Sequence, residues 1–197
     1  MSTPEATAQT LLTRPKRADA RRNYEKVLAA ARKAFAEGGE ATSLEEIARR
    51  AGVGIGTLYR NFPNRQALLE AVYVDEVDNL CRSAAEFVDL PPWEGFAAWV
   101  NRLVSYLATK QALAHELLEY MDRDAPIFQS CRASLFSAGE PLLARAQEAR
   151  AVRPDTNLSE VIQMVGGIAK IPAADPQQIE HILEIALDGL RYQPLEA

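Results

Sequence analysis

Residues 53–69 read VGIGTLYRNFPNRQALL and form the most unusual segment of the chain. Gly54 and Gly56 each disfavour a helix interior by about 1 kcal/mol relative to alanine. Thr57 is β-branched, yet apolar residues at helical spacing continue on both sides of the segment. A weak helix of small residues at this place is explained if something outside the chain has to approach its backbone closely.

Two helices are predicted immediately before this segment. Apolar residues over 24–35 follow the spacing of one helix face, and a Gly-Gly pair ends the run. Thr42 and Ser43 each precede a glutamate by three residues, which is capping-box spacing. Gly52 suits the left-handed conformation of a tight turn. With a second short helix over 54–61, the pattern is helix, turn, helix.

The remainder of the chain also has helical patterns, and no strand alternation occurs in it. Proline and capping signals separate the segments. The expected helices are 64–88, 93–107, 113–121, either two helices over 126–138 and 141–151 or one kinked helix, 157–170 and 175–190. The predicted fold class is therefore all-α.

Composition indicates a folded protein of the cytoplasm. The chain has 197 residues, of which 48% are hydrophobic, so it can bury a core. It contains no apolar run of membrane-spanning length and no secretory signal, so we expect no membrane partner. Cys81 and Cys131 lie far apart without CxxC spacing, so we expect no disulfide framework and no metal site. No cofactor is expected either.

Charge is divided unequally along the chain. Residues 1–72 carry 12 Lys and Arg against 8 Asp and Glu, whereas residues 73–197 carry 10 against 19. The net charges of these two ranges have opposite signs, which indicates two parts with different partners. Basic residues gather ahead of the first helix, at Arg14, Lys16, Arg17, Arg21 and Arg22. A solvated tail and a contact to a nucleic-acid backbone both account for such a cluster.

The helix-turn-helix pattern explains the weak helix. In this arrangement the second helix lies in the major groove of DNA and leads with its N-terminal residues. Gly54 and Gly56 would let the backbone come close to phosphates and bases, and the exposed amides at the helix start attract phosphate. Leu58 and Phe62, four residues apart, are predicted to face the protein core.

The stretch TSLEEIARRAGVGIGTLYRNFPNRQALL resembles the DNA-binding domain of the TetR family of transcriptional regulators over residues 22–70. The matching features are a threonine before the second helix, an IA pair, AGV at the turn, GTLY in the recognition helix, and FP with a basic residue ahead of ALL. The resemblance implies a flexible basic arm over 1–21, a helix-turn-helix domain over 22–72, and a helical ligand-binding and dimerisation domain over 73–197.

The resemblance also implies positions that contact the DNA backbone. Thr42, with Ser43 beside it, is similar to the family's phosphate contact at the start of the second helix. Tyr59 is similar to a tyrosine whose hydroxyl reaches the backbone, and Arg65 stands where the family has a lysine that contacts phosphate.

The resemblance further implies that base edges are read by Ile55, Gly56 and Thr57. Three positions depart from the family pattern, in which serine, an aromatic residue and histidine are frequent: Gly54, Arg60 and Asn61. Glycine is an accepted helix cap, and arginine and asparagine both bond to phosphates or bases. We therefore expect these three differences to affect which operator sequence is recognised. We include all three residues among the DNA-binding positions.

Aromatic residues in the second half have two interpretations. Each of them suits a packed core, and together with polar groups they also suit the wall of a pocket for a small-molecule effector of unknown identity. The candidate pocket residues are Trp99, Tyr106, His115, Glu119, Tyr120 and Phe128.

Two apolar stripes near the end of the chain suggest a dimer interface. Helices with such stripes suit an isologous four-helix contact between two copies, although an intramolecular core would produce the same pattern. The family resemblance favours the dimer. The candidate interface residues are Ile162, Val165, Ile179, Leu183 and Leu187.

These features together predict a regulator rather than an enzyme. Neither His115 nor His181 has a glutamate three residues before it, and neither a phosphate loop nor GxSxG is present. We expect a ligand-responsive one-component repressor that binds a palindromic double-stranded DNA operator as a homodimer and is released by its effector. A transcriptional activator and a dimeric helical interaction module with the same fold are the alternatives.

Overall fold

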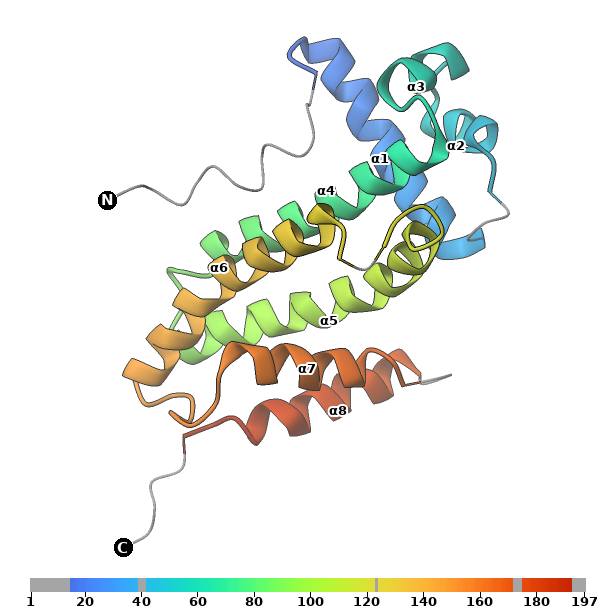
Figure 1. Ribbon diagram of the computed structural model, residues 1–197. Helices are drawn as coiled ribbons and strands as arrows, with labels where there is room; N and C mark the ends of the chain where they lie inside the picture. Colours follow the sequence, from blue (N-terminus) through green and yellow to red (C-terminus); the bar gives the residue numbers. More distant parts are fainter. Residues whose placement is uncertain (1–14, 39–41, 123, 172–174, 193–197) are drawn as a thin grey trace, which may run out of the picture. The chain divides into compact units, whose positions relative to one another are not determined.

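The computed structural model describes residues 15–38, 42–122, 124–171 and 175–192 and is all-α, which confirms the predicted fold class (Figure 1). The helices of the described residues are α1 Ala18–Gly38, α2 Leu44–Ala51, α3 Ile55–Asn61, α4 Arg65–Glu86, α5 Pro92–Leu117, α6 Pro126–Glu148, α7 Leu158–Ile168 and α8 Pro176–Asp188.

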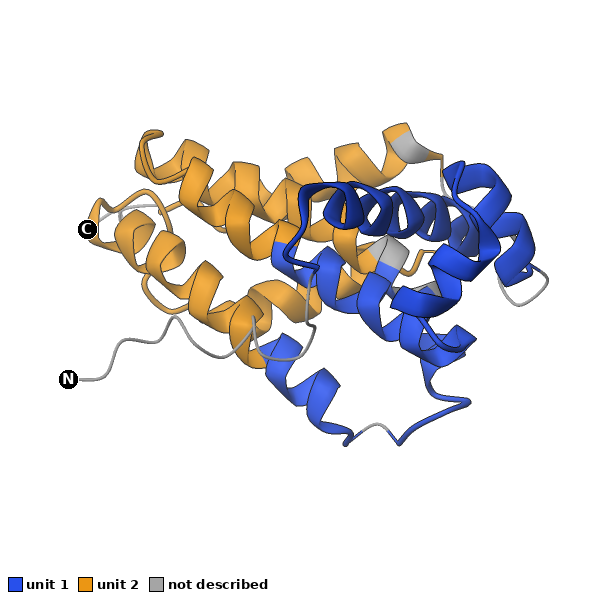
Figure 2. Ribbon diagram, turned by 90° about the horizontal axis from the view of Figure 1, so that it is seen from above, with its two compact units in different colours: residues 1–78, 109–132 blue, residues 79–108, 133–197 orange. Residues whose placement is uncertain are grey.

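The chain divides into two compact units, which Figure 2 colours separately. Unit 1 comprises residues 1–78 and 109–132, and unit 2 comprises residues 79–108 and 133–197. Helices α4, α5 and α6 therefore each contribute residues to both units. The units do not divide at a single point in the sequence, and the predicted domain boundary after residue 72 stays a prediction.

Helix α2 begins and ends as the sequence predicts. Ser43 is its N-cap, and the Ser43 hydroxyl accepts a hydrogen bond from the backbone N–H of Glu46 at 3.2 Å. Gly52 ends the helix with φ of 65°, in the left-handed region that favours glycine. The Gly52 N–H donates to Arg49 O at 3.2 Å. This turn redirects the chain into α3.

Unit 1 has a core in which α1 packs against α2 and α3. Leu58 and Phe62 are buried, as predicted from their spacing. The Phe62 ring lies 4.9 Å from the ring of Tyr24 on α1, measured between centroids. These two side chains therefore hold the short α3 against the long α1.

Two stretches of helix extend further than predicted. Helix α1 begins at Ala18, so Arg21 and Arg22 lie on a helix rather than in an arm. Arg14 and the rest of residues 1–14 lie outside the described residues. Helix α5 is continuous over the two segments predicted as 93–107 and 113–121, because the intervening ATKQA is rich in residues that favour helix.

Helix α6 is also a single helix, with Pro141 inside it. This is the second of the two alternatives left open by the sequence. A proline inside a helix lacks the N–H of one backbone hydrogen bond. The caps of the last two helices agree with prediction, since Asn157 and Glu160 form a capping box at α7 and Asp175 caps α8.

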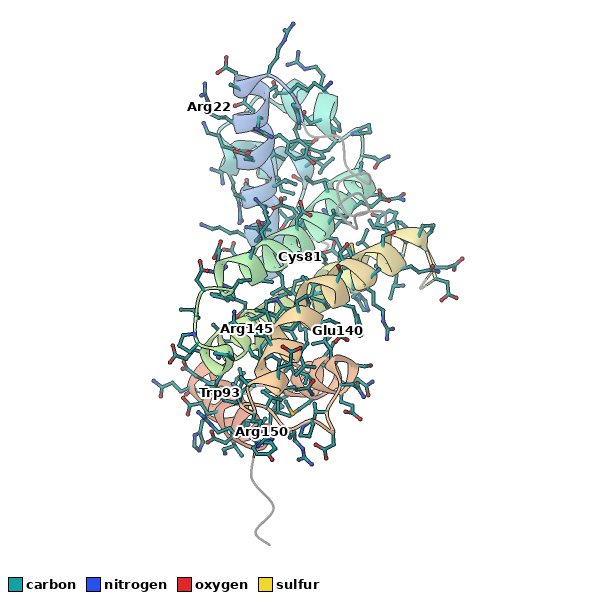
Figure 3. All side chains as sticks on the ribbon, turned by 90° about the vertical axis from the view of Figure 1, so that its left-hand side faces the viewer. Arg22, Cys81, Trp93, Glu140, Arg145 and Arg150 are labelled. Carbon is teal, nitrogen blue, oxygen red and sulfur yellow. The ribbon has the colours of Figure 1, made fainter. Side chains whose placement is uncertain are left out.

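Unit 2 is held together at one end by arginine contacts. The guanidinium of Arg145 on α6, whose side chain is labelled in Figure 3, donates to the backbone carbonyls of Val88 and Leu90, between α4 and α5. The guanidinium of Arg191 lies 4.0 Å from the ring centroid of Trp93 on α5. The Arg191 backbone also pairs with Val152 in an isolated β-bridge. The segment after α8 is thereby tied to the segment after α6.

The indole of Trp99 occupies the interior of unit 2 and packs directly on a glycine of α6. A Cβ atom added to Gly139 would lie 2.9 Å from both Cζ2 and Cζ3 of the Trp99 ring. Trp99 is fully buried, so its ring cannot turn outward to make room for an added Cβ. Gly139 is therefore required for the close approach of α5 and α6.

We predict that Gly139→Ala destabilises the protein by about 1 to 3 kcal/mol, because overpacking outweighs the helix propensity that alanine adds. Gly167→Ala on α7 is the matched control, since a Cβ there meets nothing within 4 Å. Thermal unfolding followed by circular dichroism measures both variants. An unchanged or raised Tm for Gly139→Ala would contradict the close packing of Trp99.

Candidate nucleic-acid interface

Helix α3 leaves most of its surface exposed. Leu58 is buried on its inner side, whereas Ile55 and Tyr59 are 39% and 43% exposed on its outer side. Gly54, Gly56 and Arg60 are exposed as well. The structure therefore brings these predicted DNA-binding positions together on the exposed surface of one short helix.

The two glycines of this segment are not required by the packing of the described residues. A Cβ added to Gly54 or to Gly56 meets nothing within 4 Å. Gly54 is the N-cap of α3 with φ of −66°, a value open to any residue, and its carbonyl accepts from the Thr57 N–H at 2.8 Å. Neither sterics nor backbone strain among the residues that the structure describes explains why both positions carry glycine.

Polar side chains at the end of α3 fold back onto the helix. Arg60 donates from Nε to the carbonyl of Gly56 at 3.1 Å and from Nη2 to Oγ1 of Thr57 at 2.9 Å. Asn61 donates from Nδ2 to the carbonyl of Thr57 at 2.8 Å. The Thr57 hydroxyl accepts a hydrogen bond from Arg60, so its own proton is available for donation to another group.

Tyr59 extends across to α2. Its hydroxyl lies 3.4 Å from Oε1 of Glu45, a long hydrogen bond between two exposed groups. Because this bond is long and open to water, it holds the Tyr59 hydroxyl only weakly. The Tyr59 side chain is exposed, and its predicted contact with the DNA backbone stays a prediction.

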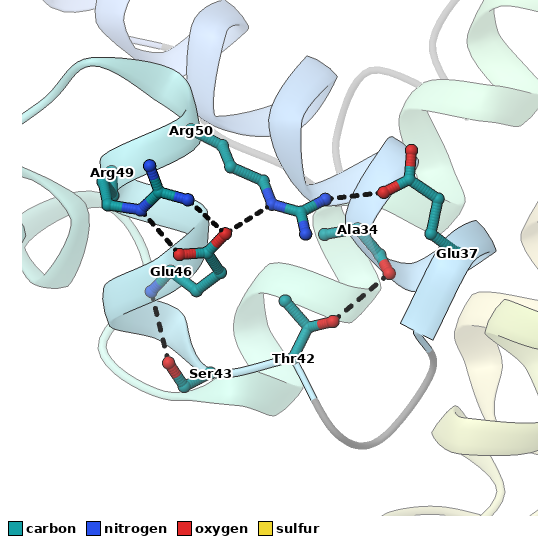
Figure 4. Close-up of polar contacts among 7 residues, drawn as sticks. All are labelled: Ala34, Glu37, Thr42, Ser43, Glu46, Arg49 and Arg50. Atoms are coloured by element: carbon teal, nitrogen blue, oxygen red, sulfur yellow. Dashed lines mark hydrogen bonds and ion pairs between the residues drawn. The ribbon is translucent and has the colours of Figure 1, made fainter.

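Thr42 and Ser43 have opposite orientations, as Figure 4 shows. The Ser43 side chain is exposed and caps α2. Thr42 is 8% exposed, and its hydroxyl donates to the carbonyl of Ala34 on α1 at 3.4 Å. The sequence did not distinguish the two residues, because each precedes a glutamate by three. The structure gives Ser43 the exposed position and Thr42 an internal hydrogen bond.

A cluster of charges that we did not predict stabilises α2. The carboxylate of Glu46 accepts two hydrogen bonds from Arg49, each of 2.7 Å, and one from Arg50 of 2.8 Å. Arg50 also pairs with Glu37 of α1 at 2.7 Å (Figure 4). Hydrogen bonds from Arg49 first and Arg50 second lower the pKa of Glu46 to about 2. The spacing of three and four residues between Glu46 and these arginines was the available sequence signal.

Arg65, the first residue of α4, is engaged inside unit 1. Its guanidinium donates to the carbonyl of Thr42 and, from Nη2, to Oε2 of Glu116 at 2.7 Å. It also lies 4.9 Å from the ring centroid of Phe35. The side chain is 20% exposed. Arg65 is therefore not an open cation in this structure, and its partner Glu116 is too distant in the sequence to be found from spacing.

The predicted effector residues have different surroundings. Trp99 and Tyr106 are buried in unit 2. His115, Glu119 and Tyr120 are exposed in unit 1. Also in unit 1, the ring of Phe128 makes an edge contact with Tyr73 at 5.3 Å between centroids. The three polar candidates are therefore surface residues, unlike the two buried aromatics.

The predicted dimer-interface residues differ in burial. Val165, Leu183 and Leu187 are buried within the single chain. Ile162 and Ile179 are half-buried. For the first three, packing inside the protomer accounts for the apolar stripe, which is the alternative that the sequence left open.

Other kinds of site receive no support within the described ranges. Those ranges contain no group of three or more His, Cys, Asp or Glu side chains placed to hold a metal ion. Among the described helices, none combines the length and the apolar character needed to cross a membrane.

Comparisons with known proteins agree with this architecture. Residues 27–72 match the model of bacterial regulatory proteins of the tetR family. Residues 91–192, more than half of the chain, match the C-terminal domain of SbtR-like transcriptional regulators. The chain belongs to the TetR family. It is accordingly a transcriptional regulator with a helix-turn-helix domain, and it is not an enzyme.

Several solved structures resemble this chain over most of its length. A TetR transcriptional regulator of Streptomyces coelicolor is 37% identical, with a TM-score of 0.75, over 86% of this chain and 99% of that one. A TetR regulatory protein of Mycobacterium vanbaalenii is 32% identical, with a TM-score of 0.75, over 90% and 99%. GusR of Salmonella enterica, 19% identical over 89% and 98% with a TM-score of 0.63, shares the fold.

Gly56→Ala separates the needs of folding from those of DNA binding. We expect it to raise stability by up to about 1 kcal/mol, because alanine favours helix and its Cβ meets nothing in the protein. We expect the same change to weaken DNA binding, because the methyl group stands where DNA would approach. Gly52→Ala is the contrasting variant, since φ of 65° makes it destabilising. Undiminished DNA affinity of Gly56→Ala would argue against close approach at α3.

Proposed function

We propose that this protein is a repressor that binds a palindromic operator as a homodimer and leaves it when a small-molecule effector binds. The exposed surface of α3 carries the proposal, because Gly54 and Gly56 have no neighbour of their own that requires glycine. Close approach of DNA supplies the missing reason. In a helix-turn-helix protein, the N-terminal residues of the second helix contact base edges in the major groove.

We assign the residues on and beside this surface to two kinds of contact with DNA. Ile55, Gly56 and Thr57 are at the start of α3 and are assigned to base edges, with the Thr57 proton available as a donor. Ser43 and Tyr59 are assigned to phosphates, since both present hydroxyls at the surface. Phosphate contacts fix the register of the protein, whereas base contacts select the sequence.

Four further positions have supporting roles in the proposal. Arg60 and Asn61 are beside Thr57 and reach either a phosphate or a base by exchanging the bonds that they make to α3. Thr42 is assigned a role behind the interface, because its hydroxyl is directed to Ala34. Arg65 reaches a phosphate only by giving up a partner inside unit 1.

The dimer is proposed to form through the outward surface of α8. A palindromic operator requires two recognition helices about 34–36 Å apart, one turn of DNA. Ile185 is 60% exposed on α8, although its neighbours Leu183 and Leu187 are buried. An isoleucine exposed to this extent beside a buried stripe is suited to contact a second copy.

The effector is proposed to bind beside Trp99. The indole Nε1 of Trp99 is buried and has no hydrogen-bond partner among the described residues. A buried donor left unpaired costs about 1 to 3 kcal/mol, so a ligand that offers an acceptor would recover this energy. Effector binding then shifts the population toward a spacing of recognition helices that no longer matches the operator.

Selection of bound duplexes from a random pool tests DNA binding and identifies the operator. With that operator, we predict that Thr57→Ala loses about 1 to 3 kcal/mol at one position of each half-site and little on random DNA. Thr156→Ala, in unit 2, is the matched control. Affinities measured by fluorescence anisotropy check this. Equal losses on operator and random DNA would show that Thr57 does not read bases, and a pool without enrichment would contradict operator binding.

We predict that Ile185→Lys produces a folded monomer, because the lysine enters the proposed contact between copies. Leu183→Arg should instead lower the stability of the protomer, since a guanidinium without a partner is disfavoured in its core. Val88→Lys, a substitution at a position 54% exposed in unit 2, is the control. Light scattering measures mass, and circular dichroism measures folding. A dimer that survives Ile185→Lys would exclude this surface of α8.

A further inference from the structure

A buried carboxylate on α5 has a single polar partner among the described residues of unit 1. Glu116 is 4% exposed, and its Oε2 accepts the 2.7 Å bond from Arg65. Its other oxygen, Oε1, is buried and has no hydrogen-bond partner within the described residues. A buried charge held by one partner is strongly destabilising once that partner is removed. Glu116 therefore constrains where the Arg65 guanidinium can go.

Arg65 connects the two ends of the helix-turn-helix segment. Thr42, whose carbonyl accepts from Arg65, immediately precedes Ser43, the N-cap of α2. Arg65 is itself the first residue of α4. Its side chain thus closes the segment 42–65, which contains α2, the turn and α3. The Phe35 ring of α1 covers the guanidinium at 4.9 Å.

We propose that Glu116 is a positioning residue for DNA binding. Its carboxylate holds the Arg65 guanidinium against the carbonyl of Thr42, and this bond keeps the start of α2 next to the start of α4. Both ends of the segment that carries α3 are then fixed relative to each other. The inference rests on the proposed DNA-binding function and assigns a role to a residue outside the helix-turn-helix.

The same contacts assign Arg65 to positioning rather than to a phosphate. The carboxylate of Glu116 balances its positive charge, and Thr42 occupies a further donor. Moving Arg65 toward DNA would leave a buried carboxylate without its partner. A cation that stays in place releases no counterion from DNA, so Arg65 should make no contribution to the salt dependence of binding.

A double-mutant cycle tests the proposal. Glu116→Gln, Arg65→Met and the double variant are compared with the native protein for affinity to the selected operator across a salt series. We expect each single change to weaken binding about tenfold, as fits the loss of one charge-assisted bond. The double variant should bind no more weakly than Arg65→Met alone, with an unchanged salt slope. Glu86→Gln and Arg102→Met remove an exposed ion pair of the same residue types and should change nothing.

Amide hydrogen exchange provides a second readout that does not involve DNA. The N–H groups of Glu46 and Ile47 bond to Ser43 at the start of α2. Both should exchange faster in Glu116→Gln and Arg65→Met, and not in the control variants. If either variant fails to fold by circular dichroism, Glu116→Asp or Arg65→Lys replaces it, with the same expected acceleration, because neither spans the original geometry.

Four results would overturn the positioning role. Additive losses in the double variant would mean that the two residues act independently. A salt slope reduced by about one unit per subunit in Arg65→Met would make Arg65 a phosphate contact. Tighter DNA binding by Glu116→Gln would mean that Glu116 restrains Arg65 from DNA. If the native protein enriched no duplex, the proposed function would fail, and unchanged exchange at Glu46 and Ile47 would separately reject the positioning role.

Discussion

The burial of Leu58 and Phe62 against α1 is the interaction on which the interface depends. A helix of seven residues that contains a glycine is not stable alone in water. Helix α3 is maintained because its inner side is packed into unit 1 and because Gly52 turns the chain at the required angle. The residues on its outer side are not needed for this packing, so small or unusual residues are tolerated there.

Fold class and the inward positions of α3 were predictable because they depend on local periodicity, caps and turns. The sequence could not separate two structures that produce the same local pattern. Thr42 and Ser43 have the same capping spacing, and the apolar stripe containing Leu183 suits either a core or an interface. The bond between Arg65 and Glu116 joins helices distant in sequence, so no local pattern indicates it. Continuity of α5 was missed because a gap in apolar spacing does not break a helix when its residues favour helix.

Charge in the first part of the chain is less available to DNA than its composition suggests. Arg50 is paired with Glu46 and Glu37, which already count among the acidic residues of 1–72, whereas Arg65 is paired with Glu116, which lies outside that range. Arg32 on α1 is paired with Asp75 on α4. These arginines hold helices together, and each has a carboxylate beside it. The excess of positive charge over residues 1–72 therefore overstates the electrostatic attraction that this unit offers to a polyanion.

The separation of the two sides of α3 makes the recognition surface open to redesign. A Cβ added at Gly54 or Gly56 meets no neighbouring atom within 4 Å, and Ile55 is substantially exposed. A library randomised at these positions would retain the buried side chains that hold the helix in place. Under the proposed role in DNA binding, such a library is a route to regulators with new operator preferences on an unchanged scaffold, because the proposed base contacts and the core contacts lie on different sides of α3.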